Sequence, residues 1–107
     1  MQGIANVIYI RGNETISINV NDSAIFYRDT TIEIDRERIF NYLETLFRIT
    51  NRWQKEYYAL DTIDGDSWEL LINYNNGKIK KYTGHANYPN NFEALERLNQ
   101  ELVNEVF

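Results

Sequence analysis

The sequence predicts a single α+β domain, residues 1–107, with about six mostly antiparallel strands and two helices packed on one face of the sheet. Three observations support this fold class. Apolar and polar residues alternate with a period of two through several short segments, the pattern of strands with one buried face. Asn, Asp and Gly residues interrupt these segments as turns do. Two longer segments carry apolar residues at helical spacing, and each follows a group of strands.

The first half of the chain begins with three or four short strands. Residues 4–10 (IANVIYI) are rich in β-prone residues and end at a Gly-Asn turn. Apolar and polar residues alternate perfectly in residues 15–21, which predicts a second strand with one buried and one solvent-exposed face. Residues 24–28 form a third strand. Residues 31–34 either prolong it or form a short fourth strand.

A helix from about Arg36 to Arg52 should follow these strands. Asp35 is suited to be its N-cap, because a short acidic side chain accepts a hydrogen bond from a free amide of the first turn. The predicted buried stripe consists of Ile39, Phe40, Leu43, Leu46, Phe47 and Trp53.

The second half repeats the order of strands and then a helix. Residues 57–62 predict a strand, and a turn at Asp64-Gly65 leads into residues 68–74, which alternate with a period of two. Asn75-Asn76-Gly77 tolerates the positive φ of a tight turn. Residues 78–83 form the return strand, and their three lysines are typical of an edge strand.

A loop and a final amphipathic helix complete the chain. Pro89 biases Tyr88 towards an extended backbone, so the loop should end there. Asn90 and Glu93 have the spacing of a capping box. The helix should run for about four turns, with a buried stripe made of Phe92, Leu95, Leu98, Leu102 and Val106.

One explanation for the similar order of the two halves is tandem duplication of a strand-hairpin-helix unit. Residues 18–25 (INVNDSAI) align with residues 72–79 (INYNNGKI), and apolar positions of the two helices align at nearly the same offset. Any two hairpin-helix units of similar composition also look alike, so both explanations stay open.

Composition and charge exclude several classes of protein. The formal net charge of −5 argues against direct nucleic-acid binding, which depends on basic side chains, and favours a protein partner with a basic surface. Residues 54–107 hold nine of the sixteen acidic groups. No cysteine is present, in keeping with a reducing cytoplasm, and no apolar run predicts a membrane span or an export signal.

No residue pattern predicts an enzyme, a cofactor or a metal site. His85 is the only histidine, so a hydrolase would have to use it, yet no nucleophile motif stands nearby. The acidic residues that superficially resemble a cation loop miss the EF-hand spacing, and we predict no metal there. They are Asp61, Asp64, Asp66 and Glu69.

The aromatic residues are the better indication of function. The chain has eight Tyr and two Trp, and half-exposed aromatic side chains are typical anchors of protein interfaces. Exposed carboxylates of the last helix could steer a basic partner towards such anchors. The predicted partner-binding residues are Tyr82, His85, Tyr88, Glu96, Glu101 and Glu105.

The segment from Trp68 to Leu95 carries a motif of the form WxLxIxYxxG, then YxG, then YPxNFxxL. It resembles a motif in small uncharacterised proteins of low-GC bacteria and their phages. The resemblance covers about a quarter of the chain and implies no chemistry. The general profile is similar in type to phage anti-defence proteins such as anti-CRISPRs.

From the sequence we therefore expect a non-enzymatic protein-binding module, of the kind that a phage or mobile element uses to inhibit a bacterial defence effector. The first alternative is a small-ligand or nucleotide-binding protein with an aromatic pocket near Tyr88. The second alternative is a small hydrolase that uses His85.

Overall fold

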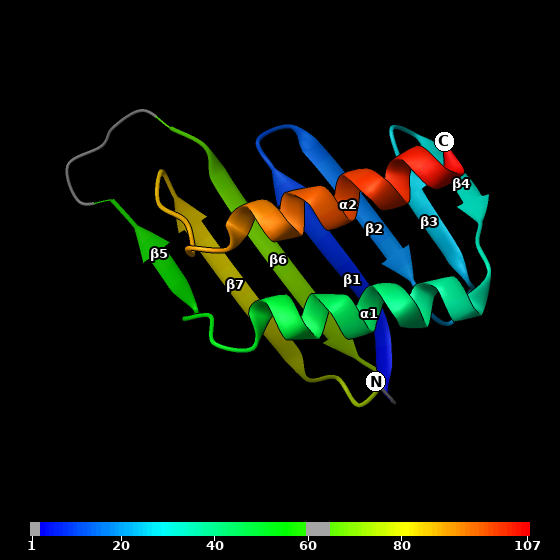
Figure 1. Cartoon of the computed structure of the whole chain (residues 1–107). Helices are drawn as coiled ribbons and strands as arrows, with labels where there is room; N and C mark the ends of the chain where they lie inside the picture. Colours follow the sequence, from blue (N-terminus) through cyan, green and yellow to red (C-terminus); the bar gives the residue numbers. More distant parts are fainter. Residues whose placement is uncertain (1–2, 60–64) are drawn as a thin grey trace.

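The computed structural model describes residues 3–59 and 65–107 and confirms the α+β fold class (Figure 1). Its one sheet has seven strands in the order β4-β3-β2-β1-β6-β7-β5, one more than the sequence predicts. Neighbouring strands are antiparallel except β5 and β7, which are parallel. The elements are β1 (Ile4–Arg11), β2 (Glu14–Asn19), β3 (Ala24–Tyr27), β4 (Thr30–Glu33), α1 (Arg36–Thr50), β5 (Glu56–Tyr58), β6 (Ser67–Tyr74), β7 (Ile79–His85) and α2 (Phe92–Val106).

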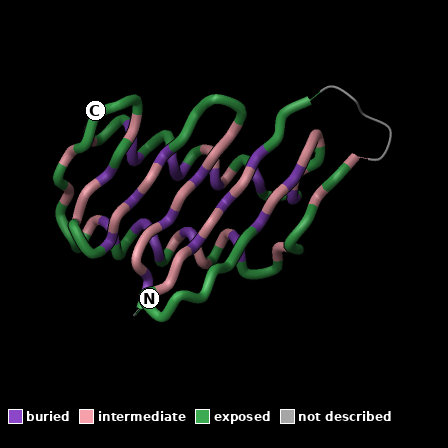
Figure 2. The backbone as a smooth tube through the Cα atoms, turned by 180° about the vertical axis from the view of Figure 1, so that it is seen from behind, coloured by how far each residue is buried: buried purple, intermediate pink, exposed green. Residues whose placement is uncertain are grey.

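The molecule has two layers, because both helices lie across the same face of the sheet (Figure 1). Val7 of the central strand β1 is fully buried and lies opposite Ile18 on one side and Ile72 on the other. The next inward position, Tyr9, lies opposite Ile16 and Leu70. Buried and partly exposed positions alternate along each central strand when the sheet is seen from behind (Figure 2). The period-two prediction is therefore confirmed.

Helix α1 begins as predicted but differs in its end and in its buried face. The Asp35 carboxylate accepts a hydrogen bond from the Glu37 amide at 3.1 Å, which confirms the N-cap. The helix ends at Thr50 and not at Arg52. Phe40 was wrongly assigned to the core: it is 37% exposed, with the Arg36 guanidinium 5.4 Å from its ring centroid. Tyr42 takes the buried place instead.

Tyr42 reaches the core because its hydroxyl has a partner there. It is 1% exposed and donates a hydrogen bond to Asn99 Oδ1 of α2 at 2.6 Å. Burial raises the pKa of Tyr42 above its ordinary value of 10.0, so the hydroxyl keeps its proton and remains a donor. Phe47 and Trp53 of the predicted stripe are partly buried against the core.

Helix α2 has the predicted buried stripe but not the predicted cap. Phe92, Leu95 and Leu102 are buried, as the helical spacing requires. The N-cap is Asn91, not Asn90, and its side chain makes no capping hydrogen bond. The Asn91 side-chain amide instead bonds to the Ile49 carbonyl and to the Trp53 indole.

The structure decides between the two predictions for residues 31–34, which belong to a separate strand. Arg28 and Asp29 have φ angles of 49° and 61°, and Tyr27 lies opposite Thr30. A two-residue loop with both φ angles positive is the primed turn that suits a twisted hairpin. Strand β4 is thus an edge of the sheet.

The other edge also differs from the prediction. Strand β5 is shorter than predicted, and residues 60–62 of the predicted strand lie outside the described residues. It pairs with β7 from Thr83 to His85, so β7 is an edge strand only in its first part, where Lys80 and Lys81 lie.

The sheet topology does not repeat one unit twice. Strands β2 and β6 are both antiparallel to β1 and therefore run in the same direction. The return strand β3 lies outward of β2, and β7 lies outward of β6 on the opposite side of β1. With the helices on one face, the two hairpins have opposite hands and cannot be superposed.

Trp68 and Phe92 join the β6-β7 hairpin to α2, with ring centroids 4.9 Å apart. Replacing either by Ala removes a large buried ring and leaves a cavity, which should lower the free energy of unfolding by about 3 to 5 kcal/mol. Urea denaturation measures this loss. A loss below about 1 kcal/mol in both variants would contradict the packing of this hairpin on α2.

Candidate functional site

A cluster of aromatic rings fills one end of the domain, between the helices and strands β6 and β7. Trp68 lies at its centre and is 1% exposed. The ring centroids of Phe92, Trp53 and Tyr57 lie 4.9, 5.7 and 6.0 Å from that of Trp68. These separations are typical of favourable aromatic contacts, so the cluster forms a rigid base for the loop above it.

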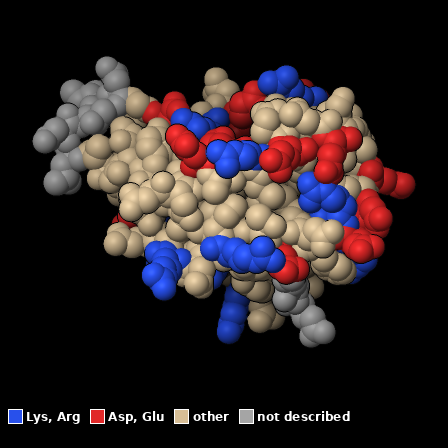
Figure 3. All heavy atoms as spheres, viewed as in Figure 1, with Lys and Arg blue, Asp and Glu red and all other residues tan. Residues whose placement is uncertain are grey.

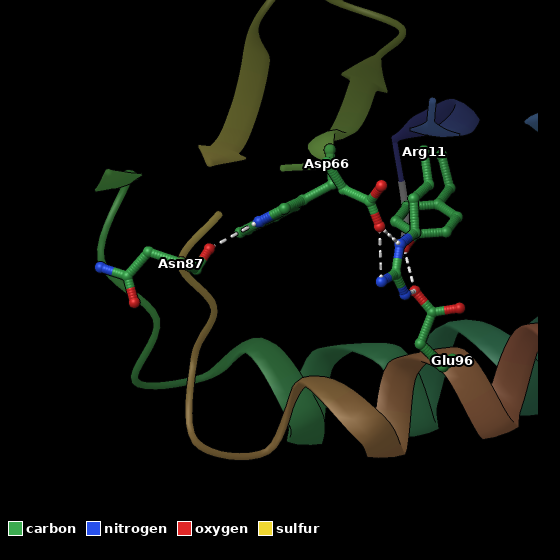
Figure 4. Close-up of polar contacts among 6 residues, drawn as sticks. Arg11, Asp66, Asn87 and Glu96 are labelled. Carbon is green, nitrogen blue, oxygen red and sulfur yellow. Dashed lines mark hydrogen bonds and ion pairs between the residues drawn. The ribbon is translucent and has the colours of Figure 1, made fainter. Parts of the chain in front are cut away.

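The loop is held by the Trp68 indole and requires glycine at position 84. Trp68 Nε1 donates a hydrogen bond to the Asn87 carbonyl oxygen at 2.9 Å (Figure 4). Gly84 lies directly opposite Trp68 on β7. A Cβ at position 84 would lie 2.7 Å from Trp68 Cε2 and 2.8 Å from the Asn87 oxygen, which is too close. The glycine thus allows the indole to cross β7 and reach the loop.

Arg11 is the charged centre of the site. Its guanidinium forms ion pairs of 2.8 Å with Asp66 and with Glu96, joining β1 to the start of β6 and to α2 (Figure 4). It also lies 5.5 Å from the ring centroids of both Tyr88 and Phe92, within the range of a cation-π interaction. One side chain therefore fixes both the carboxylates and the aromatic rings around it.

Tyr9 of β1 contacts the Glu96 carboxylate from the core side of the site. It is 5% exposed, and its hydroxyl donates a hydrogen bond to Glu96 Oε1, the oxygen that also accepts from Arg11. Burial, together with the bond to Glu96, raises the pKa of Tyr9 above its ordinary value of 10.0. The hydroxyl consequently stays protonated and holds the Glu96 carboxylate in place.

Tyr88 stands between two clefts. Its side chain is half-buried, and its ring centroid lies 4.9 Å from that of Phe92. The smaller cleft, of about 370 Å³, lies beside the start of α2 and is bordered by Arg11, Glu93 and Glu96. The larger cleft has a volume of about 470 Å³ and separates the end of α1 from the loop. Tyr88 is thus an aromatic side chain with a concave surface on each side.

The larger cleft is basic although the chain is acidic. Arg48 and Arg52 line it, together with Trp53, Tyr57 and Tyr88, and none of its lining residues is acidic. Arg48 pairs with Glu44 of its own helix at 2.7 Å, so the basic character of the cleft comes mainly from Arg52. Its two walls are tied together by Asn91, which donates to the Ile49 carbonyl at 2.8 Å and accepts from Trp53 Nε1 at 2.7 Å. The cleft is therefore preformed.

The structure separates the predicted aromatic anchors. Tyr88 lies at the surface site, whereas Tyr82 is only 4% exposed and packs edge-on against Trp53 at 5.6 Å. Assigning Tyr82 to the partner surface was therefore wrong, because its position on β7 faces the helices. His85 ends β7 on the other face, where its Nδ1 lies 2.9 Å from Ser67 Oγ. Unlike Tyr88, it lines neither cleft.

The predicted acidic residues do not form one stripe. At about 100° per residue, Glu96 and Glu105 project from opposite sides of α2. Glu96 pairs with Arg11, Glu105 pairs with Arg38 of α1 at 2.6 Å, and Glu101 is exposed. Acidic and basic atoms accordingly lie next to one another across this face (Figure 3).

The acidic residues that we predicted not to bind metal are only partly described. Asp61 and Asp64 lie outside the described residues. Asp66 pairs with Arg11, and Glu69 pairs with Lys81 at 2.8 Å. Within residues 3–59 and 65–107, no three His, Asp or Glu side chains cluster as metal ligands would, and neither helix is long and apolar enough to cross a membrane.

Sequence reasoning missed the arginines of the site. Arg11 ends β1, Arg48 lies in the last turn of α1 and Arg52 follows that helix. Nothing in their local sequence distinguishes them from solvated charges. The one available signal was the position of Arg11 two residues after an inward-facing Tyr9, which places both on the helix-covered face of the sheet.

Gly84→Ala tests the contact of Trp68 with the loop. The added Cβ has to displace a buried indole or a backbone carbonyl, so the free energy of unfolding should fall by about 2 kcal/mol or more. Gly12→Ala is the control: Gly12 has φ of 57°, but nothing lies within 4 Å of its Cβ position, so only about 1 kcal/mol of backbone strain is expected. Equal losses in the two variants would contradict the proposed role of Gly84.

Comparison with protein-family models, with curated proteins and with solved structures finds no match to this chain. The resemblance carried by Trp68 to Leu95 stays a prediction. The contacts of its residues explain the motif physically: Trp68, Gly84 and Phe92 build the aromatic cluster and the loop that carries Tyr88.

Proposed function

We propose that this chain is a non-enzymatic protein-binding module whose contact surface is centred on Tyr88. The observation that supports this is the position of the Tyr88 ring, which Arg11 and Phe92 hold between clefts of about 370 and 470 Å³. An aromatic anchor that is already ordered loses little conformational entropy on binding, and such anchors carry most of the energy of protein interfaces. An inhibitor of a bacterial defence effector is the narrower form of this proposal, and the identity of the captured partner tests it.

The two clefts suit side chains of opposite charge. Arg11, Glu93 and Glu96 border the smaller cleft, and because Arg11 pairs with Glu96, Glu93 is the carboxylate that a basic side chain of the partner would meet there. Arg48 and Arg52 border the larger cleft, which suits a carboxylate. A partner with a basic surface thus remains our proposal, with the basic contact placed beside Tyr88 rather than along the whole of α2.

The hydrolase alternative has less support. A Ser-His pair acts as a nucleophile and base when a third group orients the imidazole. The orienting group of such a pair bonds to Nδ1 of the histidine. In this structure Nδ1 of His85 is hydrogen-bonded to Ser67 Oγ instead, at 2.9 Å. Within the described residues, no carboxylate bonds to His85.

Tyr88→Ala tests the protein-binding proposal. With a partner captured from a bacterial lysate and identified by mass spectrometry, the variant should dissociate at least about tenfold faster, because the anchor is lost while the charges remain. Phe40→Ala is the matched control, since Phe40 is an aromatic side chain on α1 that is 37% exposed and lines neither cleft. Surface plasmon resonance separates the two rates. Equal effects of the two substitutions would exclude Tyr88 as the anchor.

A second candidate function is the binding of a small anionic aromatic ligand, such as a nucleotide, in the larger cleft. Its two arginines and three aromatic rings, with no acid among the lining residues, favour it specifically. ATP is a suitable probe in titration calorimetry. Saturable binding should weaken at least about tenfold in Arg52→Gln and stay unchanged in Lys78→Gln, which lies outside the cleft. No heat at millimolar ATP, or equal binding by both variants, would contradict this function.

A further inference from the structure

The face of the sheet opposite the helices is broad and uncovered. Its central side chains can be identified from the strand register: Ile8 of β1 lies opposite Ser17 of β2 and Leu71 of β6. The three are only partly buried, unlike Val7 and Tyr9, which face the helices. The seven strands extend this surface across the whole width of the molecule, as Figure 2 shows from behind.

Exposed apolar side chains concentrate on this face. Within the described residues, five large apolar side chains are exposed, and three of them share this face by register. Phe26 lies opposite Ser17, Ile79 lies opposite Asn73, and Tyr58 lies beside His85 in the pairing of β5 with β7. Their exposed fractions are 43%, 64% and 51%. Large exposed apolar side chains that share one face are typical of interaction sites.

The centre of the face is also electrically neutral. Glu69 and Lys81 form an ion pair of 2.8 Å, and the amides of Asn73 and Asn6 are joined by a hydrogen bond of 2.6 Å. Acidic groups occur on the outermost strands, where Glu33 of β4 and Glu56 of β5 lie at the margins. A neutral, partly apolar centre with a charged rim is the usual anatomy of a protein interface.

We infer that this face is the contact between two copies of the chain, packed sheet against sheet. The area fits: seven strands that are three to eight residues long and lie about 4.8 Å apart cover roughly 600 to 700 Å², close to the about 800 Å² per partner of a stable interface. Central strand β1 has three strands on each side, so a two-fold axis passing over β1 brings both faces into register.

The charges of the helix layers do not oppose a second copy in this arrangement. The chain carries a net charge of −5, so two copies repel unless their acidic groups stay apart. Sheets stack about 10 Å apart, and each helix layer adds about 10 Å, so the two α2 helices would lie more than about 20 Å from each other. This exceeds the Debye length of about 8 Å at physiological salt, which removes most of the repulsion.

The Tyr88 surface remains free in such a dimer, because it lies in the helix layer on the opposite side of the sheet. The inference therefore does not depend on the proposed function. It would give each dimer two binding surfaces facing away from one another.

Analytical ultracentrifugation of the whole chain from about 1 to 500 µM tests the inference. The wild-type protein should sediment as a dimer at the upper concentrations. Phe26→Lys should raise the dissociation constant at least about tenfold, because it places a charge in the contact. Phe40→Lys is the matched control, since Phe40 is similarly exposed at 37% but lies on α1. It should leave the dimer unchanged.

Ile79→Lys provides an independent check on the same face. Ile79 is 64% exposed, so the substitution leaves the core intact, and circular dichroism verifies the fold. It too should weaken the dimer. A monomer at 500 µM wild-type protein, or a dimer that Phe40→Lys weakens as much as Phe26→Lys and Ile79→Lys do, would overturn the inference.

Discussion

The contact of the Trp68 indole with Gly84 and the Asn87 carbonyl is the constraint on which this end of the molecule depends. Trp68 is buried under Phe92 and crosses β7 at the one position without a side chain. The Asn87 carbonyl accepts from Nε1 of this buried indole, and leaving that buried donor without a partner would cost about 1 to 3 kcal/mol. Because the loop leads directly to Tyr88 and α2, one hydrogen bond and one missing Cβ position the whole candidate site.

The charged side chains of the site act mainly on their immediate neighbours and not on distant parts of the surface. Arg11 holds two carboxylates and two aromatic rings, and Tyr9 fixes the Glu96 oxygen from the core side. Carboxylates that are paired in this way contribute little long-range field, so the surplus of acid in the second half does not create one acidic surface. The arginines of the larger cleft make that concave surface basic in spite of the net charge.

Much of the fold could be predicted from the sequence, because period two and period 3.6 follow directly from backbone geometry. The Asp35 cap, the hairpin turns and the buried stripe of α2 were predicted correctly. The misses occurred where tertiary contacts override local preference: Asn91 is used to join two elements rather than to cap α2, and Tyr42 displaces Phe40 because Asn99 accepts its hydroxyl. Of the candidate site, the surface position of Tyr88 could be predicted, but the cleft arginines meet only in three dimensions.

The central claim, that the Trp68 indole holds the loop carrying Tyr88, is tested most directly by amide hydrogen exchange in Trp68→Phe. This change keeps an aromatic ring but removes the Nε1 donor. The account predicts faster exchange of the hydrogen-bonded amides of Ala86, Tyr88 and Phe92. The amide of Val20, which bonds to Ala5 between β1 and β2, should exchange as in the wild type. Unchanged protection from Ala86 to Phe92 would contradict it.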